Sequence, residues 1–259
     1  MRYIRDLLKG DLGISYATKK PVTEMIAERL PTTLTLAFVS VLLAGVIGVV
    51  LGVISATKQY TWVDSFASIF SLIGVAMPNF WLGLVLILLF SVKLGWLPAT
   101  GFYGPSYWVL PAITIGYSLS ATITRQTRSS MLETIRQDYL RTARAKGQKE
   151  IKVIVNHALK NALIPIVTVL GMQFGGSLGG AVLTESIFSI PGIGKLMVEA
   201  IRNRDYPMVQ GGVLFIAIAA CVMNLLVDIL YAYIDPRIKS QYGSVGKVKK
   251  GKKGVRANG

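Results

Sequence analysis

The sequence predicts an all-α membrane protein with five transmembrane helices. Of its 259 residues, 52% are hydrophobic and only 16% are charged, whereas a soluble domain carries about 25% charged residues. The hydrophobic residues lie in long blocks without Asp, Glu, Lys or Arg. Each block has roughly the 20 residues that a helix needs to cross a bilayer. Because lipid offers no partner to free backbone groups, each block should be helical.

The uncharged blocks place the five spans in order along the chain, at residues of about 34–56, 66–91, 107–124, 162–184 and 207–229. The second block contains Pro78 and the fourth contains Pro165. A membrane helix tolerates proline where neighbouring groups bond the freed carbonyls, or where the proline lies in a first turn.

Basic residues predict the orientation of these spans. Segments 57–64, 125–160 and 228–259 hold 18 of the 28 Lys and Arg residues, and the segments on the other side hold 10. The richer side is expected to be cytoplasmic. We therefore predict an extracytoplasmic segment 1–31, a transmembrane domain 32–231 with a cytoplasmic loop 125–160, and a basic cytoplasmic tail 232–259.

This orientation places the N-terminal segment outside, although that segment contains no secretory signal. Either the first span acts as a reverse anchor, or a further span precedes Met1 in a longer form of the protein. We favour the second interpretation.

The chemistry of the spans argues against a proton- or sodium-driven transporter, because such proteins carry ionisable residues at membrane depth. Lys93, Glu185 and Asp228 lie only at the predicted ends of spans, where we interpret them as interface anchors. The polar residues within spans could line a pathway or bond between helices; they are Asn79, Gln173 and Asn224. One His and one Cys provide no metal site and no intrachain disulfide.

Two motifs suggest enzymes, and both are weak. Residues 175–179 match the G-x-S-x-G pattern of serine hydrolases, but His157 would lie about 30 Å from Ser177 along a helix. Glycines spaced four apart indicate close helix packing instead; they are Gly171, Gly175 and Gly179, with Gly48 and Gly52 in the first span. The sequence Gly192-Ile193-Gly194-Lys195 is followed by Leu196, so it is not a phosphate-binding loop. We predict a protein that is not an enzyme and binds no cofactor or metal.

The loop between Thr124 and Asn161 is 36 residues long, which is more than a turn between helices requires. Asp138 could cap a short helix from Tyr139 to Lys146, and Gly147 would end it in a left-handed conformation. An amphipathic helix follows, with its apolar face built from Ile151, Ile154, Val155, Ala158, Leu159, Ala162 and Leu163. Composition alone fits either a helix on anionic lipid or a surface for a protein partner.

The residues of this loop resemble the coupling segment of ABC importer permeases, and more narrowly of the dipeptide, oligopeptide and nickel permeases. The similarity lies in residues 138–147, DYLRTARAKG, and 156–165, NHALKNALIP. Further matching stretches are Gly10-Asp11-Leu12-Gly13, Leu97-Pro98-Ala99-Thr100-Gly101, residues 185–194 (ESIFSIPGIG) and Asp235-Pro236-Arg237. The general motif begins Glu-Ala-Ala, and Arg141 and Thr142 replace its first two residues, as in the peptide branch. The family's first span is absent.

The resemblance implies a type I ABC importer fold, with six spans expected for the full unit, in the inner membrane of a prokaryote. It implies a second homologous permease, two ATPase subunits that bind ATP and Mg, and an external substrate-binding protein as partners. The resemblance assigns the contact with the ATPase to Arg141, Thr142, Ala143, Arg144, Ala145, Lys146 and Gly147.

The substrate is expected to be a di- or oligopeptide. Nickel complexes and glutathione are alternatives on the same scaffold, and a stand-alone channel or membrane scaffold is the rival from another class. The basic tail could suggest a nucleic-acid partner, but a cytoplasmic flank of a membrane protein is basic for topological reasons, so we expect none.

Overall fold

The computed structural model describes residues 10–234. Residues 1–9 and 235–259 lie outside the described residues, and with them the Asp235-Pro236-Arg237 motif and almost all of the predicted basic tail. The described part is helical, apart from loops and one isolated β-bridge between Ile14 and Pro21. The all-α prediction is confirmed.

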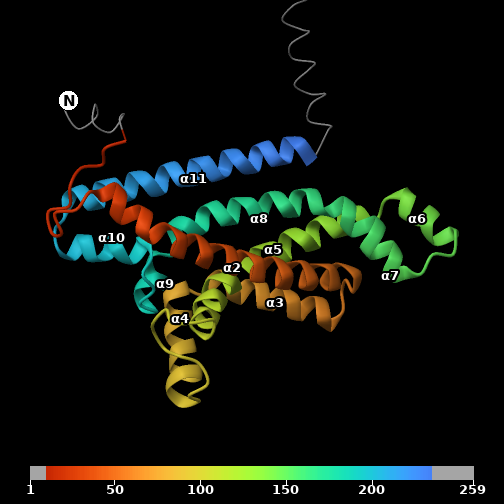
Figure 1. The fold of residues 1–259 in the computed structure, drawn as a ribbon. Coiled ribbons are helices and arrows are strands. Elements are labelled where there is room, and N and C mark those ends of the chain that lie inside the picture. Colours follow the sequence, from red (N-terminus) through yellow and green to blue (C-terminus); the bar gives the residue numbers. More distant parts are fainter. Residues whose placement is uncertain (1–9, 235–259) are drawn as a thin grey trace, which may run out of the picture.

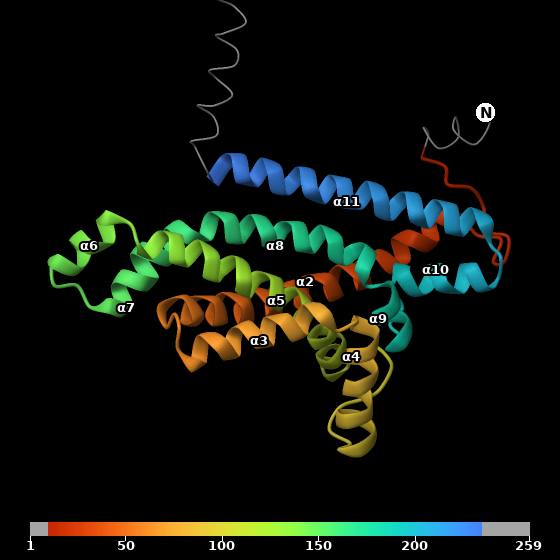
Figure 2. The same ribbon diagram turned by 180° about the vertical axis from the view of Figure 1, so that it is seen from behind.

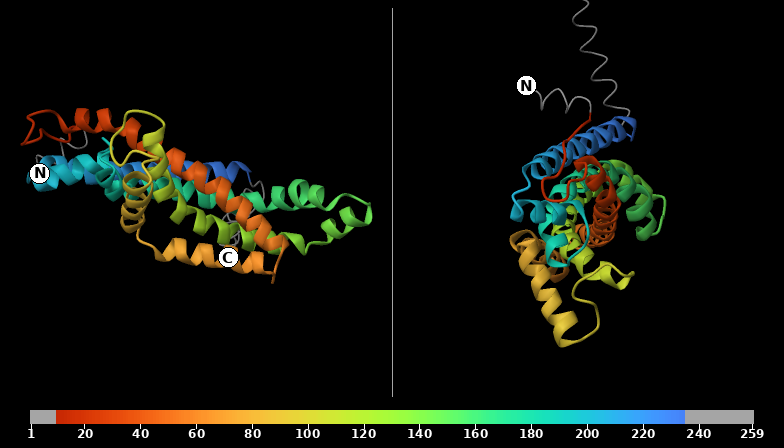
Figure 3. Two further views of the ribbon diagram at one scale, coloured as in Figure 1. Left: turned by 90° about the horizontal axis from the view of Figure 1, so that it is seen from below. Right: turned by 60° about the vertical axis from the view of Figure 1, so that its left-hand side comes forward.

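The helices run along the chain in the order shown in Figure 1. They are α2 (Val22–Thr57), α3 (Trp62–Ala76), α4 (Asn79–Leu86), the π-helix η1 (Ile87–Lys93), α5 (Ser106–Ile135), α6 (Asp138–Ala145), α7 (Glu150–Lys152), the π-helix η2 (Val153–Leu159), α8 (Lys160–Gly180), α9 (Val182–Ile187), α10 (Ile193–Arg202) and α11 (Tyr206–Ile234). The long helices α2, α5, α8 and α11 lie roughly along one axis (Figures 1 and 3).

The central contact of the bundle joins α2 to α5. Small residues of α2 make it possible, because a Cβ at Gly48 would lie 2.7 Å from the Ile123 side chain, and one at Gly52 would lie 2.8 Å from the Thr124 carbonyl oxygen. On α8, a Cβ at Gly171 would overlap the Val227 side chain of α11, whereas Gly176 faces open space. Close packing therefore explains most of these glycines, as their spacing predicts.

The second predicted span is not one straight helix. The axes of α3 and of the segment 79–93 are bent by 104°, so that α4 projects from the bundle (Figure 1). Met77, which precedes Pro78, has the extended backbone that a following proline favours. Pro78 itself lies immediately before α4, where its missing N–H costs nothing.

Three helical stretches in the described part of the chain are long and apolar enough to cross a membrane, at 22–57, 150–179 and 206–227, and the bent pair would make a fourth. The predicted span 107–124 lies within α5, which continues to Ile135. Buried hydroxyl residues, among them Thr114, Ser120 and Thr124, make α5 more polar than its neighbours. Two of these hydroxyls donate to carbonyls one turn earlier, Thr114 to Leu110 and Thr124 to Ser120, each at 2.8 Å.

The two ends of the bundle differ. At one end lie α6 and α7, and at the other lie α10 and the start of α11 (Figures 1 and 2). Each end has its own apolar cluster: Met131, Leu140 and Ile154 belong to the first, and Ile26, Met197 and Met208 belong to the second. The segment that resembles a coupling loop thus packs into the apolar cluster at its own end of the bundle.

Candidate functional site

The short helix α6 carries the predicted contact residues at the end of the bundle (Figure 1). It begins at Asp138 and ends at Ala145, close to the predicted 139–146. The prediction that Asp138 caps the helix is wrong: Gln137 occupies the cap position without a side-chain hydrogen bond, and Asp138 lies in the first turn. A carboxylate there still favours the helix through its interaction with the helix dipole.

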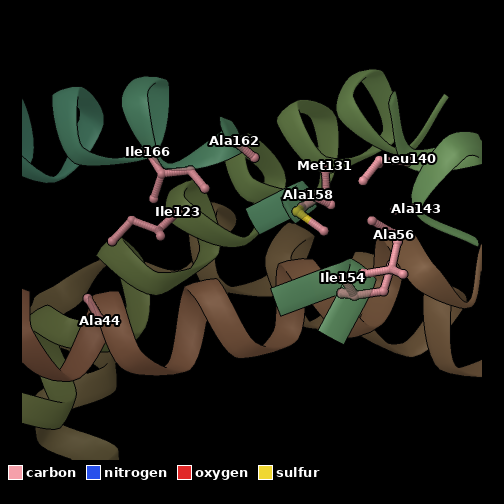
Figure 4. Close-up of a cluster of buried hydrophobic side chains, with 11 residues drawn as sticks. Ala44, Ala56, Ile123, Met131, Leu140, Ala143, Ile154, Ala158, Ala162 and Ile166 are labelled. Carbon is pink, nitrogen blue, oxygen red and sulfur yellow. The ribbon is translucent and has the colours of Figure 1, made fainter. Parts of the chain in front are cut away.

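One face of α6 is fixed in the core. Leu140 is fully buried and Ala143 is 9% exposed, and the two are three residues apart, on one side of the helix. They join a cluster with Ala56 of α2, Met131 of α5 and Ile154 of η2 (Figure 4). The packing therefore joins α6 directly to α2 and α5.

The opposite face of α6 is open to solvent. Thr142, Ala145 and Lys146 are exposed, and the Arg141 side chain is 77% exposed, with an ion pair of 3.7 Å to Asp138. This surface combines two cations with small side chains that permit close approach. It can receive an acidic partner surface.

Arg144 has a partner within its own loop. Its guanidinium donates to the Glu150 carboxylate within the same loop, with a shortest distance of 2.8 Å. Hydrogen bonding to Arg144 lowers the pKa of Glu150, and burial opposes this only in part. In this conformation Arg144 stabilises the turn between α6 and α7, and Arg141 and Lys146 are the more available cations.

Gly147 ends α6 as predicted. Its φ of +73° lies in the left-handed region, which glycine adopts without the steric cost that a Cβ imposes. The Gly147 N–H donates to the Arg144 carbonyl at 2.9 Å, and the Lys146 N–H donates to that of Thr142 at 3.1 Å. The chain thus reverses over one residue, and this turn sets the angle between α6 and α7.

The predicted amphipathic face is only partly correct. Ile154, Ala158 and Ala162 are buried, but Ile151 is 69% exposed and Val155 is 44% exposed. The π-helix η2 is the reason, since its wider turn shifts the buried face relative to a 3.6-residue period. The periodicity therefore did not predict that Ile151 and Val155 are accessible, and Tyr139 of α6 is likewise 43% exposed.

The predicted pathway residues do not form one group. Gln173 and Asn224 lie on the adjacent helices α8 and α11, and the Asn224 amide oxygen faces Gly175. Asn79 begins α4, which packs against α5 and α9. A separate apolar cavity of about 180 Å³ lies between α2, α8, α10 and α11, with Thr33, Leu178, Ile193 and Phe215 in its wall. A pathway role for the three polar residues stays a prediction.

Ser177 and His157, the residues of the weak hydrolase motif, have separate local partners. The Ser177 hydroxyl donates to the Phe174 carbonyl at 2.7 Å, and the His157 ring contacts the Gln148 amide oxygen at 2.9 Å. This geometry agrees with helix packing as the reason for the glycines around Ser177.

Comparison with known proteins identifies the family. The model of the family described as binding-protein-dependent transport system inner membrane component matches residues 48–240. The chain belongs to this family of ABC importer permeases. The resemblance seen in the sequence is thereby confirmed, and so is the expectation of a membrane transport subunit.

Individual permeases of this family are similar over most of the chain. The dipeptide transport system permease protein DppB of Alkalihalophilus pseudofirmus is 46% identical, over 92% of this chain and 80% of its own. The glutathione transport system permease protein GsiC of Escherichia coli K12 is 40% identical, over 92% of this chain and 78% of its own.

Solved ABC transporters share the fold. An inward-facing structure of the MetNI methionine transporter superposes with a TM-score of 0.67, covering 82% of this chain and 96% of that chain at 17% identity. The structure of an amino acid ABC transporter with histidines gives 0.61, covering 83% and 94% at 17% identity. The type I importer fold expected from the sequence agrees with these permease-like neighbours.

Proposed function

We propose that this permease forms part of the translocation pathway of an ATP-driven importer of short peptides and receives the mechanical signal of ATP hydrolysis through α6. The observation that carries the proposal is the two-sided character of α6. Leu140 and Ala143 anchor one face in the core, while Arg141 on the helix and Lys146 just after its end are exposed.

The surface around α6 fits a protein better than a lipid headgroup. Tyr139 and Ile151 are exposed apolar residues, and Arg141, Lys146 and Lys149 supply positive charge nearby in the chain. Exposed aromatic and arginine side chains are enriched at protein interfaces. The partner is an ATPase subunit with an acidic cleft, and ATP and Mg belong to that partner.

The complete importer would contain a second homologous permease, two ATPase subunits and an external substrate-binding protein. The direction of insertion follows from the basic residues, with α6 and the C-terminus on the cytoplasmic side. In this arrangement, closure of the ATPases would move α6 as a lever and change the packing of α2 against α5.

A di- or oligopeptide is the substrate that we propose, because the dipeptide permease is similar along 92% of this chain. Glutathione, itself a tripeptide derivative, is the second candidate, supported by the similarity to the glutathione permeases. Direct binding of dipeptides, tripeptides and glutathione to the partner substrate-binding protein would distinguish them.

The coupling role can be tested at Gly147, because a Cβ there has free space around it and only the left-handed backbone opposes a side chain. Gly147→Val should abolish most peptide uptake into proteoliposomes while the assembled importer still hydrolyses ATP. Gly147→Asn is the matched control, since asparagine tolerates this conformation, and it should retain most uptake. Equal uptake by both variants and the wild type would contradict the coupling role.

A further inference from the structure

The carboxyl group of Glu185 lies in an unexpected place. The sequence suggested an anchor at the membrane interface, but Glu185 is fully buried, and that interpretation is wrong. It lies on the short helix α9, between the end of α8 and the start of α10. A buried carboxylate is costly unless hydrogen bonds compensate for lost water, so its partners explain why it is tolerated.

The partners of Glu185 come from two other helices. The Thr33 hydroxyl on α2 donates to Glu185 Oε1 at 2.7 Å, and the Lys195 backbone N–H in the first turn of α10 donates to Oε2 at 3.1 Å. The Ile193 N–H donates in turn to the Thr33 hydroxyl oxygen at 2.9 Å. One carboxylate thus satisfies free N–H groups at the start of α10 and joins that helix to α2.

The glycines before and within α10 make room for this carboxylate. A Cβ at Gly192 would overlap the Glu185 carboxyl group, and one at Gly194 would lie 3.0 Å from Oε2 and overlap the Val182 backbone. The Gly192-Ile193-Gly194-Lys195 sequence therefore packs closely around the Glu185 carboxyl group.

The rest of α10 packs against α2 and α11 mainly through apolar contacts. Its buried residues Leu196, Met197 and Ala200 pack with Val22 and Ile26 of α2. Such contacts are non-directional, so they hold α10 on α2 without fixing its position along that helix. The hydrogen bonds of Thr33 and Glu185 are directional and fix that position.

The same residues border the apolar cavity. Thr33 and Ile193 are both part of its wall, and Leu178 of α8 lies in the wall just before α9. The position of α10 on α2 therefore contributes, through Ile193, to the shape of this end of the cavity.

We propose that Glu185 is a positioning residue for transport, whose carboxylate holds α10 against Thr33 of α2 and so sets the outer wall of the cavity. This inference rests on the proposed function as an importer. When α2 moves with α6 at the other end of the bundle, the bond between Thr33 and Glu185 makes α10 move with it. Without that bond, the movement of α2 would reach α10 only through non-directional contacts.

The sharpest variant is Thr33→Val, because valine has nearly the shape of threonine but no hydroxyl. Thr33→Ser is the matched control that keeps the hydroxyl. Both variants are assembled with the partner subunits in lipid nanodiscs and in proteoliposomes. Amide hydrogen exchange of residues 190–202 reports the bond, and the ratio of peptide taken up to ATP hydrolysed reports transport.

In Thr33→Val, the amide hydrogens of Ile193 and Lys195 should exchange roughly tenfold faster than in the wild type. This is the order of magnitude expected when a buried hydrogen bond is lost. Its uptake per ATP should fall severalfold while ATP hydrolysis and membrane level stay near wild type. Thr33→Ser should resemble the wild type in every measurement. Glu185→Gln, which keeps the shape of the side chain but lacks its charge, should fall between the two.

If amide exchange in Thr33→Val is unchanged, the hydrogen bond between Thr33 and Glu185 does not hold α10. If exchange is faster but uptake per ATP is normal, the positioning role is contradicted. A loss of uptake shared by Thr33→Ser would also overturn it. If the wild-type chain supports no ATP-dependent uptake at all, the proposed function fails and the transport role of Glu185 fails with it, although the exchange data would still report the bond itself.

Discussion

Arg128 of α5 donates two hydrogen bonds to Asp64 in the first turn of α3, at 2.8 and 2.9 Å. Asp64 is only 6% exposed and also accepts a hydrogen bond of 2.6 Å from Ser55 near the end of α2. Three helices of the transmembrane bundle therefore meet at one carboxylate. This site lies near the end of the bundle where α6 is anchored, through Ala56 next to Ser55.

Replacing Arg128 by Ala should destabilise the permease strongly, by about 3–5 kcal/mol, because it leaves a buried carboxylate without its charge partner. Thermal unfolding of the detergent-solubilised importer would measure the loss. Arg125→Ala is the control, since Arg125 is exposed on the same helix and its removal should change stability little. A combined Asp64→Asn and Arg128→Met variant should recover part of the loss, and no recovery would argue against the ion pair as the cause.

The Arg144–Glu150 pair should make the turn after α6 sensitive to acid. The pKa of Glu150 is lowered in the folded protein, so its contribution is present above the pKa of an unfolded glutamate and is lost as the pH falls through the folded value. The Glu150 side chain is 60% exposed, which limits the effect to below about 1 kcal/mol.

Hydrogen exchange of residues 146–150 at pH 7 and near pH 4 would detect this acid sensitivity. Exchange, corrected for its intrinsic pH dependence, should be faster at the lower pH in the wild type. Glu150→Gln should show the faster exchange at both values. A wild type with identical corrected exchange at both pH values would disprove the prediction.

Asp205 should hold the turn around Ser15, Tyr16 and Ala17 in place, at the end of the bundle opposite α6. Ser15 donates its hydroxyl to Asp205, and the backbone N–H of Tyr16 donates at 3.0 Å. Burial alone would raise the pKa of Asp205, but these hydrogen bonds outweigh it and the pKa is lowered. The turn is therefore stable at neutral pH and loosens only as the pH falls below the ordinary range of aspartate.

Asp205→Asn should make the amides of Tyr16 and Ala17 exchange several-fold faster at pH 7. Ser15→Ala removes one of these hydrogen bonds and should give a smaller increase. Neither change should alter the exchange of residues 138–147 at the other end of the bundle. A comparable increase there would show general unfolding in place of a local effect.

Several features of this fold could be predicted from the sequence because they depend on local chemistry. The long apolar blocks predict helices, and the spacing of Gly48 and Gly52 predicts a close helix contact without naming α5 as the partner. Gly147 predicts the end of α6. In each case a few neighbouring residues decide the outcome.

Other features depend on contacts between distant residues and could not be predicted in this way. Pro78 lies within the second predicted span, but the 104° bend depends on how α3 and α4 pack. The π-helix η2 shifted the buried face, so that Ile151 is exposed. Glu185 looked like an interface residue because its partner Thr33 is 152 positions away in the sequence.

The central claim is that α6 contacts an ATPase subunit, and site-specific photo-crosslinking tests it most directly. A photoreactive phenylalanine would replace Tyr139, which is 43% exposed on α6, and in a second variant Tyr206, which is 65% exposed at the other end of the bundle. Irradiation of the assembled importer should join position 139 to the ATPase subunit and leave position 206 unlinked to it. Crosslinking of position 139 to lipid alone, or equal ATPase crosslinking from both positions, would contradict the account.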